Sequence, residues 1–334
     1  MAAPPLLAIE GLTTRFVTSA GSANAVDGLS LHVDEGETLA LVGESGCGKS
    51  VTALSIMRLV PNPPGRIVSG RILLAGRDLL QMSEAETRSV RGKDVAMIFQ
   101  EPMTSLNPVF TIGRQIEEGL VEHGAVSPRA ARRRAIELLE VVRLPEPHQI
   151  IDRYPHHLSG GMRQRVMIAI AIACGPKLLI ADEPTTALDV TIQAQILNLL
   201  RGLQKEFRMG LLLITHDLGV VAEMAQRVVV MYAGRKVEEA GVRDLFHHPQ
   251  HPYTRGLLGA TPRVRQGRSG KREKLTEIAG MVPSLFDMPQ GCAFQPRCSW
   301  AIDRCTLSPP EDASTEDGRR VACFVAQDAA LAAR

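Results

Sequence analysis

A glycine-rich stretch near the N-terminus constrains the fold more than any other part of this sequence. Residues 43–50 read GESGCGKS and match the pattern G-x-x-x-x-G-K-[ST]. An apolar run predicts a short strand at 39–42, and a helix is predicted from about 49 to 60, where PNPP ends it. Such a loop binds phosphate through its backbone N–H groups and the helix N-terminus. Lys49 would then reach the β- and γ-phosphates of a nucleotide, and the Ser50 hydroxyl would ligate Mg²⁺.

A second stretch, LLIADEP at 178–184, predicts a buried strand that ends in two carboxylates. The carboxyl ends of parallel strands lie at one edge of a sheet, so these side chains should lie beside the phosphate loop. Asp182 would complete the Mg²⁺ shell, and Glu183 would polarise the attacking water as a general base. Many strands end in acidic turns, and it is the pairing with the phosphate loop that makes this pattern informative.

The composition is that of an ordinary globular protein and restricts the partners. Of 334 residues, 45% are hydrophobic and 22% charged, and the net charge of +2 argues against nucleic acid as the main partner. The longest strongly apolar run, at 166–174, has nine residues, whereas a helix needs about 20 to cross a bilayer. The N-terminal residues lack the basic and apolar regions of a signal peptide. We therefore expect a cytosolic chain whose role at a membrane is indirect.

The order of predicted elements indicates an α/β fold with a mostly parallel core sheet. Alternating runs in the first 40 residues predict an antiparallel β lobe, and residues 111–175, which contain no convincing strand, are interpreted as a helical insert. The predicted division is a core at 1–110 and 176–260, the insert at 111–175, and a linker with a cysteine-rich segment at 261–334. Core strands are predicted at 95–99, 178–181, 211–215 and 227–231.

A third stretch, LSGGM at 158–162, precedes the apolar run at 166–174. A serine N-cap followed by two glycines leaves backbone N–H groups exposed at the start of a helix, which predicts a second anion site. An ordinary helix cap would leave the two glycines unexplained. The chain therefore carries two helix N-termini suited to phosphate.

Together, these stretches resemble the nucleotide-binding motifs of ABC transporter ATPases. GESGCGKS resembles the Walker A loop, LLIADE resembles Walker B, and LSGGM resembles the signature LSGGQ, with Met162 where the usual pattern has glutamine. The resemblance implies an ABC-type P-loop ATPase core with an antiparallel β lobe and a helical insert. It implies ATP contacts from a set of residues: Phe16, Gly43, Ser45, Gly46, Cys47, Gly48, Lys49, Ser50, Val51, Ser159, Gly160, Gly161, Asp182 and Asp189.

The resemblance also assigns roles to side chains around the γ-phosphate. Gln100 occupies the Q-loop position, which would sense Mg²⁺ and link hydrolysis to a transmembrane partner, and His216 in LLLITHD matches the switch histidine. Asp189 in TALD matches the D-loop aspartate, and Phe16 in TTRF matches the aromatic residue that stacks on adenine. The implied catalytic residues are Glu183, His216 and Gln100, and the implied Mg²⁺ ligands are Ser50, Gln100 and Asp182.

In this family two subunits enclose two ATP molecules, each between the Walker loops of one subunit and the signature of the other. Ser159, Gly160 and Gly161 would therefore contact ATP held by a partner chain. One set of motifs implies that the chain works as a dimer. A non-transport ABC ATPase of repair or translation and a regulatory ATP-binding module are the alternatives. The sequence has neither a long coiled-coil insert nor a second cassette, which would be typical of the repair and translation members.

Further stretches resemble the ATPases of peptide importers. They are EPMTSLNPVFTIGRQI at 101–116, ADEPTTALDVTIQAQIL at 181–197, HHPQHPYTRGLL at 247–258 and VPSLFDMPQGCAFQPRCSWAIDRC at 282–305. The similarity is greatest to dipeptide transport ATP-binding proteins, with oligopeptide and nickel ATPases as relatives. It implies a peripheral complex at the cytoplasmic face of the inner membrane. Its expected partners are a second, different ATPase subunit, two permeases and an extracytoplasmic peptide-binding protein.

Four of the six cysteines lie near the C-terminus: Cys292, Cys298, Cys305 and Cys323. A reducing compartment argues against disulfides. Zinc is an alternative with four thiolates, although zinc sites usually contain close C-x2–4-C pairs. A [4Fe–4S] cluster suits more widely spaced thiolates, and the resemblance to peptide importers implies such a cluster here. We expect it to be a structural staple of a short segment, with a redox sensor as the alternative.

Overall fold

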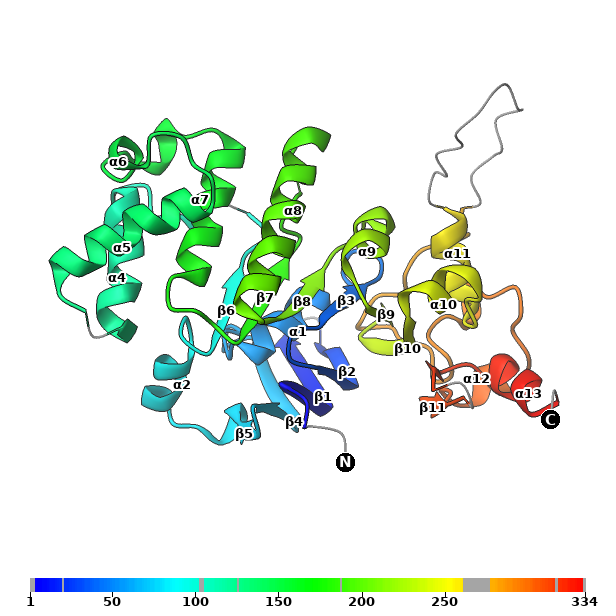
Figure 1. Ribbon diagram of the computed structural model, residues 1–334. Coiled ribbons are helices and arrows are strands. Elements are labelled where there is room, and N and C mark those ends of the chain that lie inside the picture. The colour runs from blue at the N-terminus through cyan, green and yellow to red at the C-terminus, as the bar shows by residue number, and fades with distance from the viewer. Residues whose placement is uncertain are drawn as a thin grey trace, which may run out of the picture.

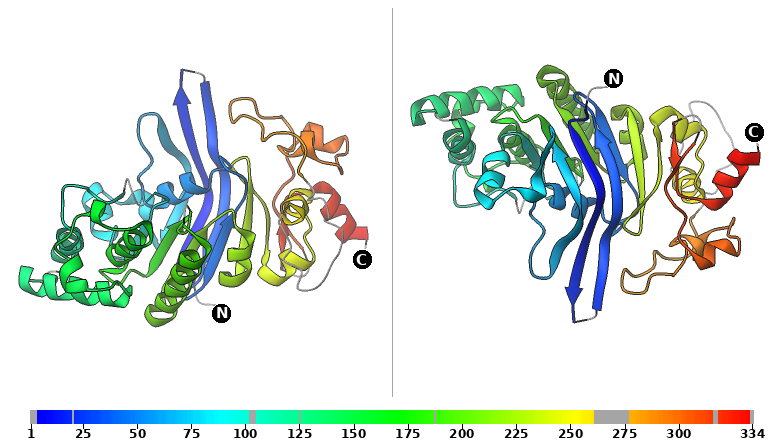
Figure 2. Two further views of the ribbon diagram at one scale, coloured as in Figure 1. Left: turned by 90° about the horizontal axis from the view of Figure 1, so that it is seen from above. Right: turned by 90° about the horizontal axis from the view of Figure 1, so that it is seen from below.

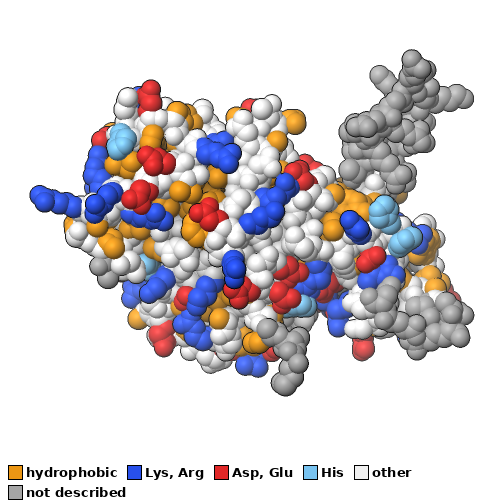
Figure 3. All heavy atoms as spheres, in the orientation of Figure 1, with side chains coloured by type: hydrophobic (Ala, Val, Ile, Leu, Met, Phe, Trp, Pro, Cys, Tyr) orange, Lys and Arg blue, Asp and Glu red, His pale blue; other side chains and the backbone are white. Residues whose placement is uncertain are grey.

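The computed structural model describes residues 4–19, 21–101, 105–124, 126–186, 188–260, 277–315 and 318–332. Most of the predicted linker, residues 261–276, lies outside this part of the chain, as do residues 102–104 after Gln100. Within the described ranges no helix has both the length and the apolar character needed to cross a membrane. On the face drawn in Figure 3, Lys and Arg side chains are interspersed with Asp and Glu.

An eight-stranded sheet forms the centre of the molecule (Figure 1). Five strands in the order β9-β3-β8-β7-β6 run parallel, and β10, β12 and β11 extend the sheet beyond β9 by antiparallel pairing. Every residue of β3, β6, β7 and β8 is buried, as expected for parallel strands covered on both faces. The strands are β3 (Thr38–Val42), β6 (Val95–Ile98), β7 (Leu178–Asp182), β8 (Gly210–Ile214), β9 (Arg227–Tyr232), β10 (Arg235–Gly241), β11 (Ala313–Ser314) and β12 (Arg320–Val321).

A smaller antiparallel sheet forms the predicted β lobe, in the order β2-β1-β4-β5. Its two long strands run side by side across the molecule in both views of Figure 2. Their inward side chains share one hydrophobic cluster with Leu39 and Leu41 of β3 and with Ala53 and Ile56 of the helix after the phosphate loop. The small sheet therefore packs onto the element that carries the loop. Its strands are β1 (Leu7–Thr18), β2 (Gly21–Val33), β4 (Gly65–Leu74) and β5 (Arg77–Asp78).

The residues between β6 and β7 form helices, as predicted, and α4, α5 and α7 pack on one another (Figure 1). They share a second hydrophobic cluster with the β6, β7 and β8 side of the main sheet. The longer helices are α1 (Lys49–Ile56), α2 (Glu84–Val90), α4 (Ile112–Gly124), α5 (Pro128–Val141), α7 (Gly160–Ile172), α8 (Val190–Phe207), α9 (Leu218–Met224), α10 (Val242–His247), α11 (Pro252–Gly259) and α13 (Phe324–Ala332). Short helical turns are α6 (Pro147–Ile150), α12 (Arg304–Leu307) and the 3₁₀ segments Leu79–Gln81, Pro155–His157 and Gln295–Arg297.

Helix α1 ends at Ile56, earlier than the predicted end at about residue 60. Arg58 takes a left-handed backbone conformation with a φ of 50°. The N–H of Leu59 then donates to the carbonyl of Leu54 at 2.8 Å, and the N–H of Arg58 donates to that of Ser55 at 3.0 Å. This pair of bonds is a Schellman cap, which ends the helix before the PNPP stretch is reached.

The C-terminal segment packs on the main sheet and shares its core. In β12, Val321 is in register with Glu238 of β10 and is fully buried. Phe294 is 4% exposed and lies against Tyr232, Tyr253 and His251, with ring centroids 5.2, 5.4 and 5.8 Å away. The sequence predicted that this segment needs a metal to hold it together, but its apolar side chains belong to a hydrophobic cluster built on β9 and β10.

We expect Phe294→Ala to lower the free energy of unfolding by about 3–5 kcal/mol, because it leaves a cavity among packed aromatic rings. Leu307→Ala is the matched control, since Leu307 is 77% exposed, and should change it by less than about 0.5 kcal/mol. Urea unfolding followed by intrinsic fluorescence measures both. Equal losses in the two variants would contradict a packed C-terminal core.

Candidate functional site

The register of three parallel strands brings the sequence motifs to one edge of the main sheet. Ile214 of β8 is in register with Leu41 of β3 on one side and with Asp182 of β7 on the other. From these positions the chain continues into the loop at 43–50 and into His216. The carboxyl ends of the three strands therefore bring the phosphate loop, the acidic pair and the histidine to the same edge.

Two glycines of the loop lie in close contact with the neighbouring backbone. Gly43 and Gly48 have φ values of 150° and 100°. A Cβ atom on Gly43 would collide with the carbonyl oxygen of Met231, and one on Gly48 with that of Ala25. Only glycine fits at these positions, so β9 and β2 fix the path of the loop.

Lys49 lies within the loop and is 6% exposed. Its Nζ donates to the carbonyl oxygen of Gly43 at 2.8 Å and to that of Glu44 at 3.0 Å. These bonds offset the cost of burying an ammonium group and aim it at the inside of the loop, where it can bind phosphate. The other loop residues differ in exposure: Ser45 and Gly46 are exposed, Cys47 and Gly48 are buried, and Ser50 and Val51 are partly buried.

Asp182 offers a buried carboxylate oxygen that suits a divalent cation. The residue is 3% exposed, and its Oδ1 has no hydrogen-bond partner among the described residues. Burial raises the pKa of Asp182, while a hydrogen bond with Ser50 acts in the opposite direction. A bound cation would satisfy the unpaired oxygen and favour the charged carboxylate. Mg²⁺ is held by one or two carboxylates together with substrate phosphates, so buried Asp182 with Ser50 beside it fits this ion.

Glu183 is the centre of a hydrogen-bonded group. Its Oε2 accepts bonds from Gln100 Nε2 at 3.1 Å and from Thr186 Oγ1 at 2.8 Å, and its Oε1 lies 3.1 Å from His216 Nδ1. Its backbone has a φ of 46°, and its N–H donates to the carbonyl of Ile214 at 2.9 Å. Burial acts to raise the pKa of Glu183, but the hydrogen bonds with Thr186 and His216 outweigh it, and the pKa lies below its ordinary value. The carboxylate is thus charged and oriented at neutral pH, as a general base requires.

The signature residues lie in a different part of the structure from the phosphate loop. Ser159 is the N-cap of α7 and accepts a bond from the N–H of Met162 at 3.4 Å. Ser159 and Gly160 are exposed, whereas a Cβ on Gly161 would lie 2.8 Å from the side chain of Ile192 in α8. Helix α7 packs with α4 and α5, and the loop belongs to the cluster shared with the small sheet. The structure does not bring the two predicted anion sites of one chain together.

Asp189 and Phe16 lie at the ends of other elements near the site. The Asp189 carboxylate caps α8 by accepting a bond from the N–H of Ile192 at 2.9 Å. Phe16 of β1 pairs with Ala23 of β2 and is partly buried against Gly65, where an added Cβ would lie 2.8 Å from the ring. The neighbouring strand β2 also carries Ala25, whose carbonyl oxygen lies against Gly48 of the loop.

The prediction of an iron–sulfur cluster at Cys292, Cys298, Cys305 and Cys323 is wrong, and so is its zinc alternative. The described residues contain no group of three or more His, Cys, Asp or Glu side chains that could hold a metal ion. All six cysteines are free, and burial raises the pKa of Cys292 to about 11, with further increases from the other three thiols. Cys305 and Cys323 are buried, and Cys292 and Cys298 pack against the hydrophobic cluster built on β9 and β10.

Two contacts at the site involve residues outside the predicted set. Thr186 bonds to Glu183, and the available signal was a hydroxyl residue three positions after Glu183. Glu44 in the loop bonds to Tyr253 and Arg297, which lie 209 and 253 residues further along the chain. No local pattern in the sequence could have paired residues this far apart.

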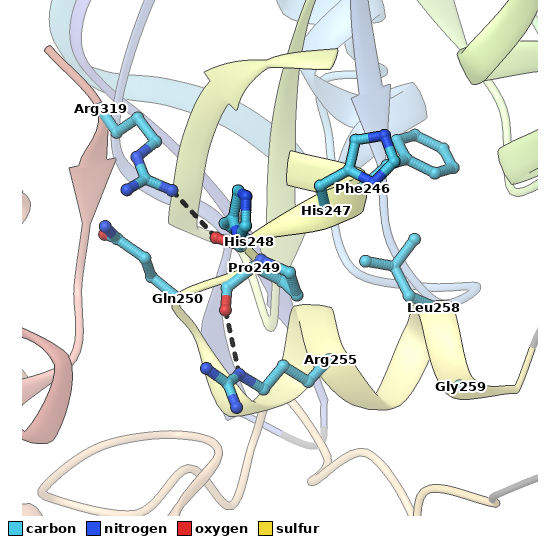
Figure 4. Close-up of a pocket in the computed structure, with 9 residues that line it drawn as sticks. All are labelled: Phe246, His247, His248, Pro249, Gln250, Arg255, Leu258, Gly259 and Arg319. Atoms are coloured by element: carbon cyan, nitrogen blue, oxygen red, sulfur yellow. Dashed lines mark hydrogen bonds between the residues drawn. The ribbon is translucent and has the colours of Figure 1, made fainter. Parts of the chain in front are cut away.

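A separate pocket of about 540 Å³ lies at α10 and α11 (Figure 4). At its rim, Arg319 donates to the carbonyl of His248 at 2.9 Å, and Arg255 donates to that of Pro249 at 2.9 Å. None of the motif residues lines this pocket. It is therefore distinct from the phosphate-binding site.

Two protein-family models match the chain. The model described as "ABC transporter" matches residues 26–186, which contain the phosphate loop, the signature and the acidic pair. The model described as "Oligopeptide/dipeptide transporter, C-terminal region" matches residues 237–305. The second match contains both Tyr253 and Arg297.

Curated relatives are similar over almost the whole chain. The oligopeptide transport ATP-binding protein AppD of Bacillus subtilis is 53% identical over 97% of this chain and 97% of its own length. The dipeptide transport ATP-binding protein DppD of the same organism is 48% identical over 96% of this chain and 94% of its own length.

Solved structures share the fold of the ATP-binding part. A dimeric ATP-binding cassette, MJ0796, bound to ADP and Pi, is 28% identical, with a TM-score of 0.64 over 71% of this chain and 99% of that chain. The cassette cbiO1 of Clostridium perfringens, part of the transporter complex cbiONQ, is 26% identical, with a TM-score of 0.62 over 74% of this chain and 92% of that chain. The predicted α/β cassette fold is confirmed.

We expect Thr186→Ala to raise the pKa of Glu183 toward its ordinary value, because one of the hydrogen bonds that favour the carboxylate is lost. Carboxyl carbon NMR of the full-length chain, titrated with acid, measures this pKa, and Glu183→Gln identifies its signal. Ser105→Ala is a control, because among the described residues the Ser105 hydroxyl donates to the carbonyl of Glu101, away from Glu183. An unchanged titration in Thr186→Ala would refute the part assigned to this hydroxyl.

Proposed function

The chain belongs to the ABC transporter ATPases that carry the oligopeptide/dipeptide transporter C-terminal region, and we propose that it hydrolyses ATP to drive peptide import. One observation carries the proposal. Lys49, Asp182 and Glu183 converge at one sheet edge. Lys49 supplies a buried ammonium group, Asp182 an oxygen without a partner among the described residues, and Glu183 an ionised carboxylate. This is the chemistry that phosphoryl transfer to water needs.

ATP binds with its phosphates in the loop at 43–50. The backbone N–H groups of the loop and of the first turn of α1 donate to the phosphate oxygens, and Lys49 pairs with the β- and γ-phosphates. Phe16 stacks on the adenine from the β lobe. Ser50, Gln100 and Asp182 would hold Mg²⁺, which when bound neutralises charge on the phosphate oxygens.

Glu183 activates the water that attacks the γ-phosphorus. Its carboxylate accepts a proton from that water, while the bond between the γ-phosphorus and the bridging oxygen of ADP breaks. Gln100, Thr186 and His216 are bonded to the same carboxylate and keep it in one orientation. These contacts already exist in the single chain.

A partner chain completes the site. Ser159 and Gly160 are exposed at the N-terminus of α7, and the proposed contact of this end is with ATP in the loop of the partner. Asp189 caps α8 beside this surface. We divide the chain accordingly into an ATP-binding core (1–110 and 176–260), a signature part (111–175) and a C-terminal part (261–334). The proposed pair is a heterodimer with a second, homologous ATPase.

The transported solute is proposed to be a di- or oligopeptide. The names of AppD and DppD support this class, since both act in peptide transport and match nearly the full chain. The complete assembly would contain two permeases and an extracytoplasmic peptide-binding protein, with this chain at the cytoplasmic face. Closure of the ATPase pair on ATP and its opening after hydrolysis supply two states for the permeases to follow.

We expect Glu183→Gln to retain ATP and to lower its turnover by about 10²- to 10⁴-fold, because the general base is lost while the binding groups remain. Turnover and bound nucleotide are measured on the assembled transporter. Glu122→Gln is the matched control, since Glu122 is exposed on α4, and should behave as wild type. Unchanged turnover in Glu183→Gln would refute the base assignment.

The substrate class is tested in the same assembly. We expect ATP turnover to rise when the binding protein is loaded with a dipeptide, because the loaded protein favours closure of the ATPase pair. A binding protein supplied with Ni²⁺ should leave turnover at its basal rate. Stimulation by Ni²⁺ and not by dipeptide would overturn the peptide assignment.

A further inference from the structure

Glu44, the second residue of the phosphate loop, is bonded to helix α11 and to the C-terminal part of the chain. Its N–H donates to Tyr253 Oη at 2.8 Å, and its carbonyl oxygen accepts from Lys49 Nζ at 3.0 Å. Its carboxylate accepts two bonds from Arg297, at 2.7 and 3.0 Å. The loop and the C-terminal part therefore meet at one residue, which also bonds the phosphate-binding lysine.

Besides its bonds to Glu44, the Arg297 side chain is held in place by other hydrogen-bond partners. Its side chain is 5% exposed, and its remaining N–H groups donate to the carbonyl of Ala279 at 3.0 Å, to that of Ile278 at 3.3 Å and to Tyr232 Oη at 3.3 Å. Its hydrogen bonds with Glu44 raise its pKa further above the ordinary value. A guanidinium fixed in this way loses little side-chain entropy when it pairs with a carboxylate.

Tyr253 is equally well fixed. Its ring is fully buried, with the ring centroid of Tyr232 4.7 Å away and that of Phe294 5.4 Å away. His251 holds the start of the same helix by accepting a bond from the N–H of Tyr253 at 3.0 Å. Helix α11 and the C-terminal part therefore each offer Glu44 one partner whose position is set by packing.

The charge of Glu44 is unfavourable for a loop that binds a polyanion. A carboxylate near the phosphates would repel them, and the Glu44 side chain is only 30% exposed, so water screens it incompletely. Arg297 supplies the opposite charge in direct contact and turns the carboxylate toward the C-terminal part. The same contact leaves the backbone carbonyl of Glu44 to hold Lys49.

We propose that Arg297 is a positioning residue of the ATP site, which neutralises Glu44 and holds its carboxylate away from the phosphates. ATP affinity at this loop then depends on the docking of the C-terminal part. The inference rests on the proposed binding of ATP by the loop at 43–50. It gives residues 237–305, matched as a transporter C-terminal region, a direct part in the nucleotide site.

A double-mutant cycle on the full-length chain in the assembled transporter tests the proposal. We expect Arg297→Gln to raise the Kd of ATP, and the KM of hydrolysis, on the order of tenfold while kcat changes little. The Glu44 carboxylate, left without its partner, would repel ATP equally in the ground state and in the transition state. Glu44→Gln should bind ATP as tightly as wild type or more tightly. The double variant Glu44→Gln/Arg297→Gln should recover most of the affinity that Arg297→Gln loses.

If the Arg297–Glu44 pair only stabilises the fold, the ATP affinities of the variants should follow a different pattern. In that case both single variants and the double variant would bind ATP more weakly, and this result would overturn the proposal. Arg297→Lys keeps the charge but loses the bidentate geometry, so it should restore part of the affinity that Arg297→Gln loses. If Arg297→Gln does not fold, the comparison of Glu44→Gln with wild type and Arg297→Lys decides, because tighter binding supports neutralisation and weaker binding refutes it.

Two further variants separate this inference from the proposed function. Arg320→Gln breaks an ion pair with Asp312 inside the C-terminal part, at 2.9 Å, and should leave ATP affinity unchanged. Lys49→Ala should abolish ATP binding. If Lys49→Ala binds ATP like wild type, the phosphate-loop assignment and this inference both fail. If Lys49→Ala loses ATP and Arg297→Gln does not, only the role of Arg297 fails.

Discussion

The register of β3, β8 and β7 is the constraint on which the rest of the site depends. Ile214 is paired with both Leu41 and Asp182, so the loop, the acidic pair and His216 start from the same edge of the sheet. A shift of one residue in either pairing would turn alternate side chains of a fully buried strand to the wrong face. The apolar packing of both faces therefore fixes the chemistry, because it fixes the register.

Two kinds of contact then complete the nucleotide site. Local contacts act within the motifs: Thr186 and His216 favour the ionised form of Glu183. Buried Asp182 has one oxygen that no other described residue bonds, and this oxygen is suited to a cation. Long-range contacts act on the loop itself, where Tyr253 and Arg297 hold the backbone and the carboxylate of Glu44. The C-terminal part, which the sequence suggested was an appendage held by metal, is packed into the sheet and bonded to the loop.

Much of the fold and of the nucleotide site could be predicted from the sequence because the patterns that indicate them lie within short stretches. The core strands differ from their predicted bounds by at most one residue at each end, since continuous apolar runs mark buried parallel strands. Helix α1 ended early because a non-glycine residue, Arg58, adopted the left-handed conformation that the cap requires. The metal site predicted for the C-terminal cysteines was wrong because their spacing resembles a ligand set. The structure of this segment depends on its pairing with β10, more than 50 residues earlier. The pairing of Glu44 with Arg297 required the fold itself.

ATP hydrolysis at this chain's site is proposed to drive peptide across a membrane. Uptake of a labelled dipeptide into proteoliposomes tests it most directly, with the assembled transporter in the membrane, the binding protein outside and ATP inside. Peptide should accumulate in proportion to the ATP hydrolysed, and no accumulation should occur when ATP is omitted. ATP hydrolysis without peptide uptake, or uptake that does not require ATP, would contradict it.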